Sequence, residues 1–219
     1  GERNSAFGRD ALDSNTTGSH NTAVGQAALY LNTTASYNTA CGKESLRNNT
    51  TGAENTAIGY GALFYNTTAT GNVAVGSETL KQNTTGDNNT AIGYVALNAN
   101  TTGVRNTAVG RQSMNANTTG GYNSALGHNA LSLNTTGTYN AAFGYNSLES
   151  STTAYKNTAF GGFALTVNTT GHSNTALGYN SLASNSTGNY NVCIGERAGD
   201  NNTTGGSNTF VGVHAGGSN

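Results

Sequence analysis

Charge, proline and long hydrophobic runs are scarce or missing in this sequence. Charged residues make up 9% of it, and the formal net charge of −1 offers no basic surface for nucleic acid or an anionic membrane. Proline and tryptophan are absent. No apolar run is long enough to cross a bilayer, so we expect no direct membrane insertion of this segment.

Insertions and deletions are also missing from a repeat that fills the chain. The motif N-T-A-V-G begins at Asn21, and versions of it recur every 17 residues. Loops of an enzyme tolerate changes of length, whereas stacked coils must lie in register. The strict period therefore predicts a single repeat solenoid over residues 1–219 and argues against an enzyme. The repeats begin at Asn4, Asn21, Asn38, Asn55, Asn72, Asn89, Asn106, Asn123, Asn140, Asn157, Asn174, Asn191 and Asn208.

Hydrophobic residues are only 34% of the chain, a composition that would permit disorder. The apolar residues nevertheless keep fixed places when each repeat is numbered from its first Asn. Position 3 is Ala until the last two repeats, position 4 is always apolar and position 5 is always Gly. Position 9 is Leu or Met until the last two repeats, and positions 12 to 15 read N-T-T-G with few exceptions. A disordered chain has no need for such phasing.

Each repeat is predicted to form one coil with two short strands. The first strand covers positions 2 to 4, the second covers about positions 8 to 10, and N-T-T-G makes the return turn. Alternation places positions 2 and 4 on one face and position 3 on the other. Gly at position 5 is expected to need a positive φ, whereas Ala35, Ala69 and Ala154 at position 15 indicate that this site does not. The fold class is all-β, a parallel β-solenoid of about thirteen 17-residue coils, about 60 Å long at ~4.8 Å per coil.

Stacking of identical positions predicts ladders along the solenoid. The position 1 amides are expected to hydrogen-bond from coil to coil, as stacked amides do in cross-β structures. The Thr residues at positions 13 and 14 offer hydroxyl ladders in the same way. The structural ladder residues are represented by Asn21, Asn38, Asn55 and Asn72 and by the stacked glycines Gly25, Gly42, Gly59 and Gly76.

The predicted core is thin, with apolar side chains at positions 3, 4, 8 and 9 only. We therefore expect self-association, most simply a homotrimer in which position 4 or 9 faces a shared axis, although another homo-oligomer stays open. Cys41 and Cys193 are interpreted as small buried residues that replace Val and Ala. Nine coils separate them, about 40 Å at the coil spacing, which is too far for a disulfide.

Residues 23–29, A-V-G-Q-A-A-L, follow a pattern that resembles the head repeat of trimeric autotransporter adhesins. The longer repeat N-T-A-[VIL]-G-x-x-[AS]-L-x-x-N-T-T-G is also similar to repeats of phage tail fibres and fibre-like bacterial surface proteins. The resemblance implies a left-handed β-roll, three chains per fibre, and an extracellular place on a bacterial cell surface or virion. The additional N-T-T-G residues depart from the adhesin pattern.

Catalytic and metal-binding patterns do not recur in the repeat. The histidines and acidic residues are scattered over several positions, and the calcium-binding G-G-x-G-x-D repeat is missing. No cofactor is expected. The N-T-T triplets match the N-glycosylation acceptor, but we interpret them as turn chemistry, because laddered Asn side chains could not carry glycans on every coil.

Exposed aromatic residues are the candidate binding residues. Four tyrosines share position 6 and four share position 17, where they could stack on a cell-surface glycan or receptor, although shielding of the solenoid is the alternative. These candidates are Tyr60, Tyr94, Tyr145 and Tyr179 at position 6, and Tyr37, Tyr122, Tyr139 and Tyr190 at position 17.

The sequence thus favours a structural and adhesive fibre shaft that contributes stiffness and multivalent display. The alternative is a solenoid that binds glycan, or ice through its Thr ladders, although the adjacent Thr residues at positions 13 and 14 point to opposite faces of an extended strand. No atypical cap precedes Asn4, and Gly199, Phe210 and Gly216 depart from the repeat near the other end. We expect the segment to belong to a longer fibre.

Overall fold

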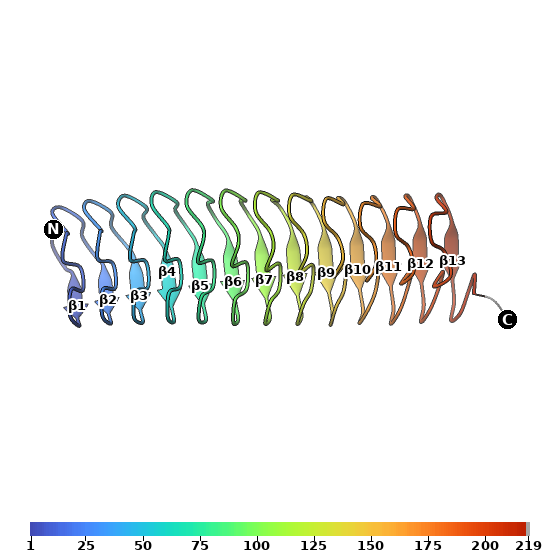
Figure 1. Cartoon of the computed structure of the whole chain (residues 1–219), viewed down its shortest axis with the longest axis horizontal. Helices are drawn as coiled ribbons and strands as arrows, with labels where there is room; N and C mark the ends of the chain where they lie inside the picture. Colours follow the sequence, from blue (N-terminus) through green and yellow to red (C-terminus); the bar gives the residue numbers. More distant parts are fainter. Residues whose placement is uncertain (218–219) are drawn as a thin grey trace. The chain divides into compact units, whose positions relative to one another are not determined.

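The structure is a computed structural model that describes residues 1–217. It is an all-β parallel β-solenoid with one coil per 17-residue repeat, as the period predicts, and each coil contributes one strand of three residues (Figure 1). The strands are β1 (Ser5–Phe7), β2 (Thr22–Val24), β3 (Thr39–Cys41), β4 (Thr56–Ile58), β5 (Val73–Val75), β6 (Thr90–Ile92), β7 (Thr107–Val109), β8 (Ser124–Leu126), β9 (Ala141–Phe143), β10 (Thr158–Phe160), β11 (Thr175–Leu177), β12 (Val192–Ile194) and β13 (Thr209–Val211).

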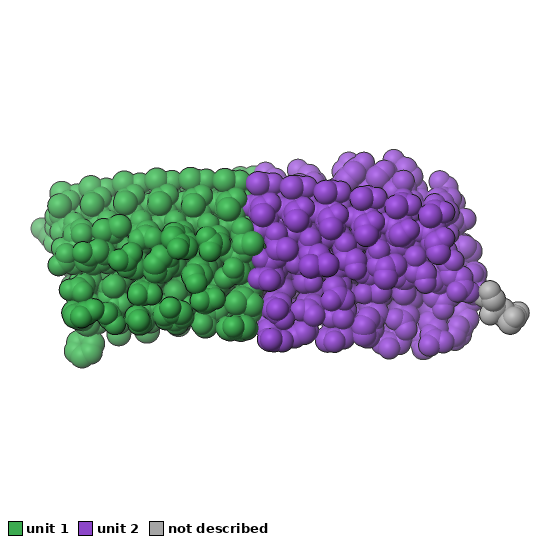
Figure 2. Space-filling model, viewed as in Figure 1, with its two compact units in different colours: residues 1–106 green, residues 107–219 purple. Residues whose placement is uncertain are grey.

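Contacts divide the chain into two compact units, Gly1–Asn106 and Thr107–Asn219 (Figure 2). Unit 1 contains β1 to β6 and unit 2 contains β7 to β13. The sequence predicted one repeat solenoid, and each of the two units is a solenoid of the same coil.

Within each unit, neighbouring strands pair in parallel with a register shift of one repeat. Ala6 lies opposite Ala23 in unit 1, and Ala159 lies opposite Ala176 in unit 2. Every position of the repeat is therefore stacked on the same position of the next coil. The predicted strand at positions 2 to 4 is confirmed, and it is built from the Thr and β-branched residues that favour strands.

The second strand, predicted at positions 8 to 10, is wrong. These residues form turns, and non-glycine residues at positions 7 and 9 adopt left-handed backbone, with φ of 55° at Ala27 and 50° at Leu29. Coil-to-coil bonding continues without a strand, because the Leu29 amide donates to the Ser45 carbonyl over 3.0 Å. Leucine rarely adopts a positive φ, so no residue type at these positions indicates this turn.

Glycine at position 5 is required by the backbone, as expected. Gly25 has a φ of 131°, and a Cβ placed on it would lie 2.6 Å from the carbonyl oxygen of Gly42 in the next coil. Position 15 needs no positive φ, and Ala35 occupies it in a buried place. Both predictions from the pattern of Gly and Ala are confirmed.

The core of a coil consists of positions 3, 8 and 9 together with two asparagines. In the second coil Ala23, Ala28 and Leu29 are fully buried, as are Asn21 and Asn32. The predicted place of position 4 in the core is wrong. Strand alternation turns it outward with position 2, and Ile58 of β4 is 41% exposed.

The two cysteines illustrate the difference between positions 3 and 4. Cys193 replaces Ala at position 3 and is buried, as expected. Cys41 occupies position 4 and is exposed, which corrects the expectation that both thiols are buried. The apolar residue type at position 4 does not indicate burial, because this position faces away from the core.

Candidate functional surfaces

The predicted amide ladder at position 1 is formed in both units. The backbone N–H of Asn38 donates to the side-chain oxygen of Asn21 over 3.0 Å, and its Nδ2 donates to the Gly52 carbonyl over 2.9 Å. Asn55 makes the same backbone bond to the Asn38 oxygen. Each buried amide therefore satisfies a backbone donor of the next coil and a carbonyl of its own coil.

A second amide ladder runs along position 12, where the sequence predicted only a turn. Asn49 Nδ2 donates to Asn32 Oδ1 over 3.0 Å and to the Gly52 carbonyl over 2.8 Å. The constant Asn at this position, present in every repeat except that of Ser151, could have indicated a ladder. It did not do so because a return turn also favours Asn. Asn32 and Asn49 are fully buried, which agrees with the interpretation that these triplets are not glycan acceptors.

The position 12 ladder of unit 2 is interrupted at Ser151. The Asn134 Oδ1 and Ser151 Oγ atoms are buried and have no hydrogen-bond partner. Asn168, in the following coil, donates to the Gly171 carbonyl over 2.9 Å. The serine side chain is too short to replace the amide, so an unsatisfied acceptor remains inside the coil.

The two threonine positions differ from each other. At position 13 the Thr33 hydroxyl donates to the backbone carbonyl of Thr50 over 3.2 Å, and the Thr50 hydroxyl donates to the Thr67 carbonyl over 3.0 Å. The ladder thus joins hydroxyls to carbonyls, rather than hydroxyls to one another as expected. Thr34 and Thr51 at position 14 are exposed, so each coil contributes one exposed threonine to a column that runs along the unit.

All eight candidate tyrosines are exposed, but several lie against other aromatic rings. Tyr122 and Tyr139 stack with ring centroids 5.0 Å apart and planes inclined by 13°, and Tyr37 stacks on His20 at 4.9 Å. Tyr145 and Tyr179 both make edge contacts with Phe163, at 5.2 and 5.9 Å. Ring stacking covers faces that a sugar would need, so these contacts favour the shielding role over the glycan-binding role.

The remaining candidates have separate surroundings. The Lys43 ammonium lies 5.9 Å from the ring centroid of Tyr60, a cation–π contact between neighbouring coils. Tyr190 meets the His172 ring at 5.2 Å with planes inclined by 87°. Tyr94 is exposed at position 6 of unit 1. The structure does not gather the eight tyrosines into one site.

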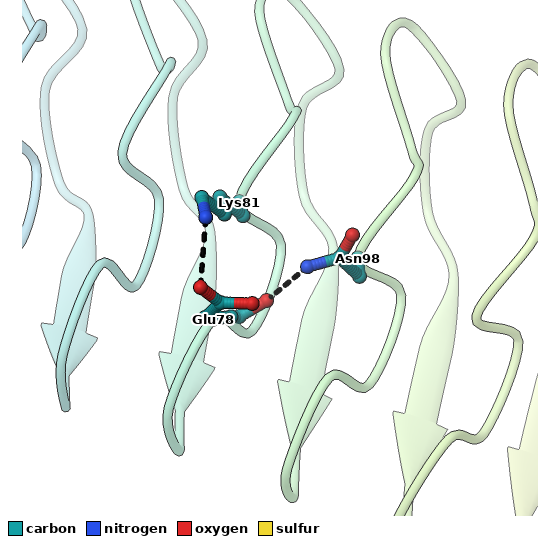
Figure 3. A network of polar contacts seen from close by, with 3 residues as sticks. All are labelled: Glu78, Lys81 and Asn98. Atoms are coloured by element: carbon teal, nitrogen blue, oxygen red, sulfur yellow. Dashed lines mark hydrogen bonds and ion pairs between the residues drawn. The ribbon is translucent and has the colours of Figure 1, made fainter.

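Charged side chains form ion pairs along the turn edge of unit 1. Lys81 Nζ lies 2.8 Å from Glu78 Oε1, and Asn98 Nδ2 donates to the Glu78 backbone carbonyl over 2.7 Å (Figure 3). The hydrogen bond to Glu78 raises the pKa of Lys81 above its usual value. The ion pair lies within one coil, whereas the Asn98 hydrogen bond joins that coil to the next. Half-exposed ion pairs of this kind contribute little to stability individually.

A small hollow lies on the same edge at the first coils of unit 1. Its volume is about 230 Å³, and it is open and polar, with two arginines and two carboxylates among its lining residues. Residues 1–217 contain no cluster of three or more His, Cys, Asp and Glu side chains that could hold a metal ion. The lining residues are Arg9, Asp10, Gln26, Ala27, Tyr30, Glu44 and Arg47.

The outward side chains of position 4 form the apolar stripe, one row on the strand face of each unit. The stripe side chains range from half-buried at Val75 to 78% exposed at Phe7. In unit 2 the Phe143 and Phe160 rings stack at 5.6 Å. The stripe comprises Phe7, Val24, Cys41, Ile58, Val75 and Ile92 in unit 1, and Val109, Leu126, Phe143, Phe160, Leu177, Ile194 and Val211 in unit 2.

Comparison with known proteins adds no assignment to these surfaces. No helix among residues 1–217 has the length and hydrophobicity needed to cross a membrane. No protein-family model, curated protein or solved structure matches the chain.

Proposed function

We propose that this chain is a shaft segment of an extracellular fibre on a bacterial cell surface or virion. Its role is to project and display, and it carries out no catalysis and uses no cofactor. The observation that carries this proposal is the pair of buried amide ladders, which join coil to coil inside each unit. A binding or catalytic site needs a few unusual coils, whereas a shaft needs every coil to be alike.

The ladders support stiffness for a physical reason. Neighbouring coils are joined at the strand, at the turn and at the return, for example by Gly42 N–H to Val24 O at 2.8 Å and Thr33 N–H to Thr50 O at 3.2 Å. The hydrogen bonds of the asparagine side-chain amides lie in the interior of the coils and add to these backbone hydrogen bonds. Separating two coils would break all of these bonds together, each with a net contribution of about 1 kcal/mol.

Homotrimer formation is part of the proposal. The second coil buries only four apolar side chains, Ala23, Ala28, Leu29 and Ala35, which is a small core for a free-standing solenoid. Three chains side by side would also place three copies of each outer position on one fibre, so that weak contacts with a glycan or receptor add up. The resemblance to trimeric adhesin heads supports this number.

Negative-stain electron microscopy and small-angle X-ray scattering test the shaft proposal. We expect straight rods of about 60 Å per segment, from thirteen coils at ~4.8 Å each. Proteolysis should cleave them slowly, because the described strands and returns are bonded on both sides in the interior of each unit. Compact or sharply hinged particles would contradict the proposal.

Glycan binding is a second candidate, favoured by the exposed tyrosines at two edges of the coil. A glycan array with this segment alone separates a binder from a shaft. If a glycan binds, changing Tyr60 and Tyr94 or Tyr139 and Tyr190 to Ser identifies the edge responsible. Retained binding in both variants would place the site elsewhere.

Ice binding is supported only by the exposed threonine column at position 14. The neighbouring position 13 hydroxyls are engaged with backbone carbonyls, so a flat double rank of free hydroxyls does not form from these two positions. Thermal hysteresis at micromolar protein would revive this function, and its absence would remove it.

A further inference from the structure

We propose that the apolar stripe is the face through which copies of this chain associate along their length. This inference rests on the proposed function, including its homotrimer, and names the surface through which the copies meet. The stripe is position 4 of the repeat, which is apolar in all thirteen copies and faces outward from the strands.

The coil itself does not explain why position 4 is always apolar. Its interior is filled by positions 3, 8 and 9, and Ile58 and Phe160 are 41% and 55% exposed on the outside. Position 6, which is also exposed, varies freely and includes Arg9, Tyr60 and Glu196. A constant apolar residue on an exposed face indicates a surface that is covered in the assembled state.

The stripe also lies on a face without charge. All nine cationic and ten acidic residues of the chain fall at positions 6, 7, 10, 16 or 17. Position 2, which shares the strand face, holds only Ser, Thr, Val or Ala. Covering this face would therefore desolvate hydroxyls and apolar groups but no ionised side chain, which removes the main penalty of forming an interface.

The repeat identifies the partner as a second copy of this chain. A partner that covers the stripe at every coil must present its own contacts with the same axial spacing. Another copy has that spacing, because its strands pair with a shift of one repeat, as Thr39 with Thr56. An unrelated globular partner would contact a few coils and leave the others without a reason to stay apolar.

The sizes of the stripe side chains separate a protein partner from a rigid lattice such as ice. They vary from Cys41 and Val75 in unit 1 to Phe143 and Phe160 in unit 2. A lattice needs groups of one height, whereas side chains of a second copy can change rotamer and fill the space beside residues of different size. Variation within an apolar class is what a protein interface tolerates.

Sedimentation equilibrium of the full chain tests the proposal with two variants of one coil. Ile58→Asp places a charge on the stripe, and Thr68→Asp places the same charge at exposed position 14 of the same coil. We expect the wild type and Thr68→Asp to have the mass of two or more chains, each chain being 22.2 kDa. Ile58→Asp should weaken association at least about tenfold, because the aspartate would be desolvated without a partner.

Thiol labelling gives an independent measurement on the unmodified protein. Cys41 lies on the stripe and Cys193 is buried in the coil. Cys41 should react slowly with a maleimide in the native assembly and rapidly in Ile58→Asp, whereas Cys193 should react in both only after unfolding. Should Ile58→Asp fail to fold, protection of Cys41 in the native wild type still decides the question.

Three results would overturn the proposal: a wild-type mass of one chain, an Ile58→Asp mass equal to that of the wild type, or rapid labelling of native Cys41. The outcome is separable from that of the shaft proposal. A single-chain rod would remove the stripe interface and the homotrimer but keep the shaft, whereas compact oligomers with a protected Cys41 would keep the interface and remove the shaft.

Discussion

The two units are built from the same coil but differ in one interior row and one exterior row. In unit 1 the position 12 ladder is unbroken from Asn15 to Asn100, whereas in unit 2 it is interrupted at Ser151 and resumes at Asn168. The apolar stripe of unit 1 is mostly β-branched, as at Val24 and Ile92, whereas that of unit 2 includes Leu126 and Phe143. The interior row loses hydrogen bonds at the one position where Asn is replaced, whereas the exterior row accommodates several different apolar residues.

The largest expected effect is the same in both units. Gly59→Ala in unit 1 and Gly144→Ala in unit 2 would place a Cβ 2.5 Å and 2.6 Å from backbone atoms of the next coil, at φ of 128° and 138°. Strain and overpacking together should lower the free energy of unfolding by about 4 kcal/mol. Urea unfolding followed by circular dichroism measures this change.

The matched control for the glycine variants is Gly52→Ala at position 15. A Cβ on Gly52 would lie 2.3 Å from the Ala69 carbonyl oxygen, but Gly52 has no positive φ, and the coils with Ala35 and Ala69 already accommodate a Cβ at this position. The change should therefore cost less than Gly59→Ala. Equal losses at Gly52 and Gly59 would show that crowding between coils, rather than the backbone conformation at position 5, determines the need for glycine.

The next effect transfers the defect of unit 2 into unit 1. Asn66 donates to Asn49 Oδ1 over 2.8 Å and accepts from Asn83 Nδ2 over 3.0 Å. Asn66→Ser should break both bonds and lower the free energy of unfolding by about 2 kcal/mol, since buried amide groups would lose their partners. Thermal unfolding measures the loss, and Thr68→Ser on the exposed column is the control that should change little.

The converse change repairs unit 2. Ser151→Asn would supply a donor to Asn134 Oδ1 and restore the row toward Asn168. We expect the free energy of unfolding to rise by about 1 kcal/mol. Unchanged or lower stability, with a normal circular dichroism spectrum, would show that the coil around Ser151 has adjusted to the shorter side chain.

The smallest effect concerns the buried thiol of unit 2. Burial raises the pKa of Cys193 from 9.0 to about 11. Between these values the unfolded chain loses its thiol proton while the folded chain keeps it, so stability should fall as the pH rises from 9 toward 11. Cys193→Ala, which restores the usual residue of position 3, should lose less stability over this range.

Comparing the wild type with Cys193→Ala removes the contribution of Lys81 to the change of stability at alkaline pH. Lys81 also has a raised pKa, and its ion pair with Glu78 is present in both chains. Its effect on stability therefore cancels in the difference between wild type and Cys193→Ala. Parallel curves of stability against pH would mean that the thiol is hydrated in the folded chain.

Sequence reasoning succeeded where one physical reason determined a residue. The strand at positions 2 to 4, the ladder through Asn21 and the glycine at Gly25 were each predicted from a constant residue type and the alternation of a strand. It failed where two reasons lead to the same residue. Asn32 suits a turn as well as a ladder, and Ile58 suits a core as well as an outer apolar surface.

The turn at position 9 failed for a different reason. Leu29 adopts a left-handed backbone that its residue type disfavours, and its side chain is fully buried in this conformation. The compensation comes from the coils on either side, which no local pattern reports. The surroundings of the tyrosines could not be predicted for the same reason. Tyr122 stacks on Tyr139 because the neighbouring coil also has a tyrosine at position 17, a position where the residue type varies from coil to coil.

The register shift of one repeat also determines how such a chain can change in length. The ladder contacts within a unit join a residue to its counterpart 17 positions away, as Asn49 to Asn32. Loss or gain of one residue would turn inward side chains outward in the strand that contains it. Loss or gain of one whole repeat would bring equivalent partners together again. Genes for such chains can therefore lengthen or shorten by recombination in steps of one coil, with no new contact to invent.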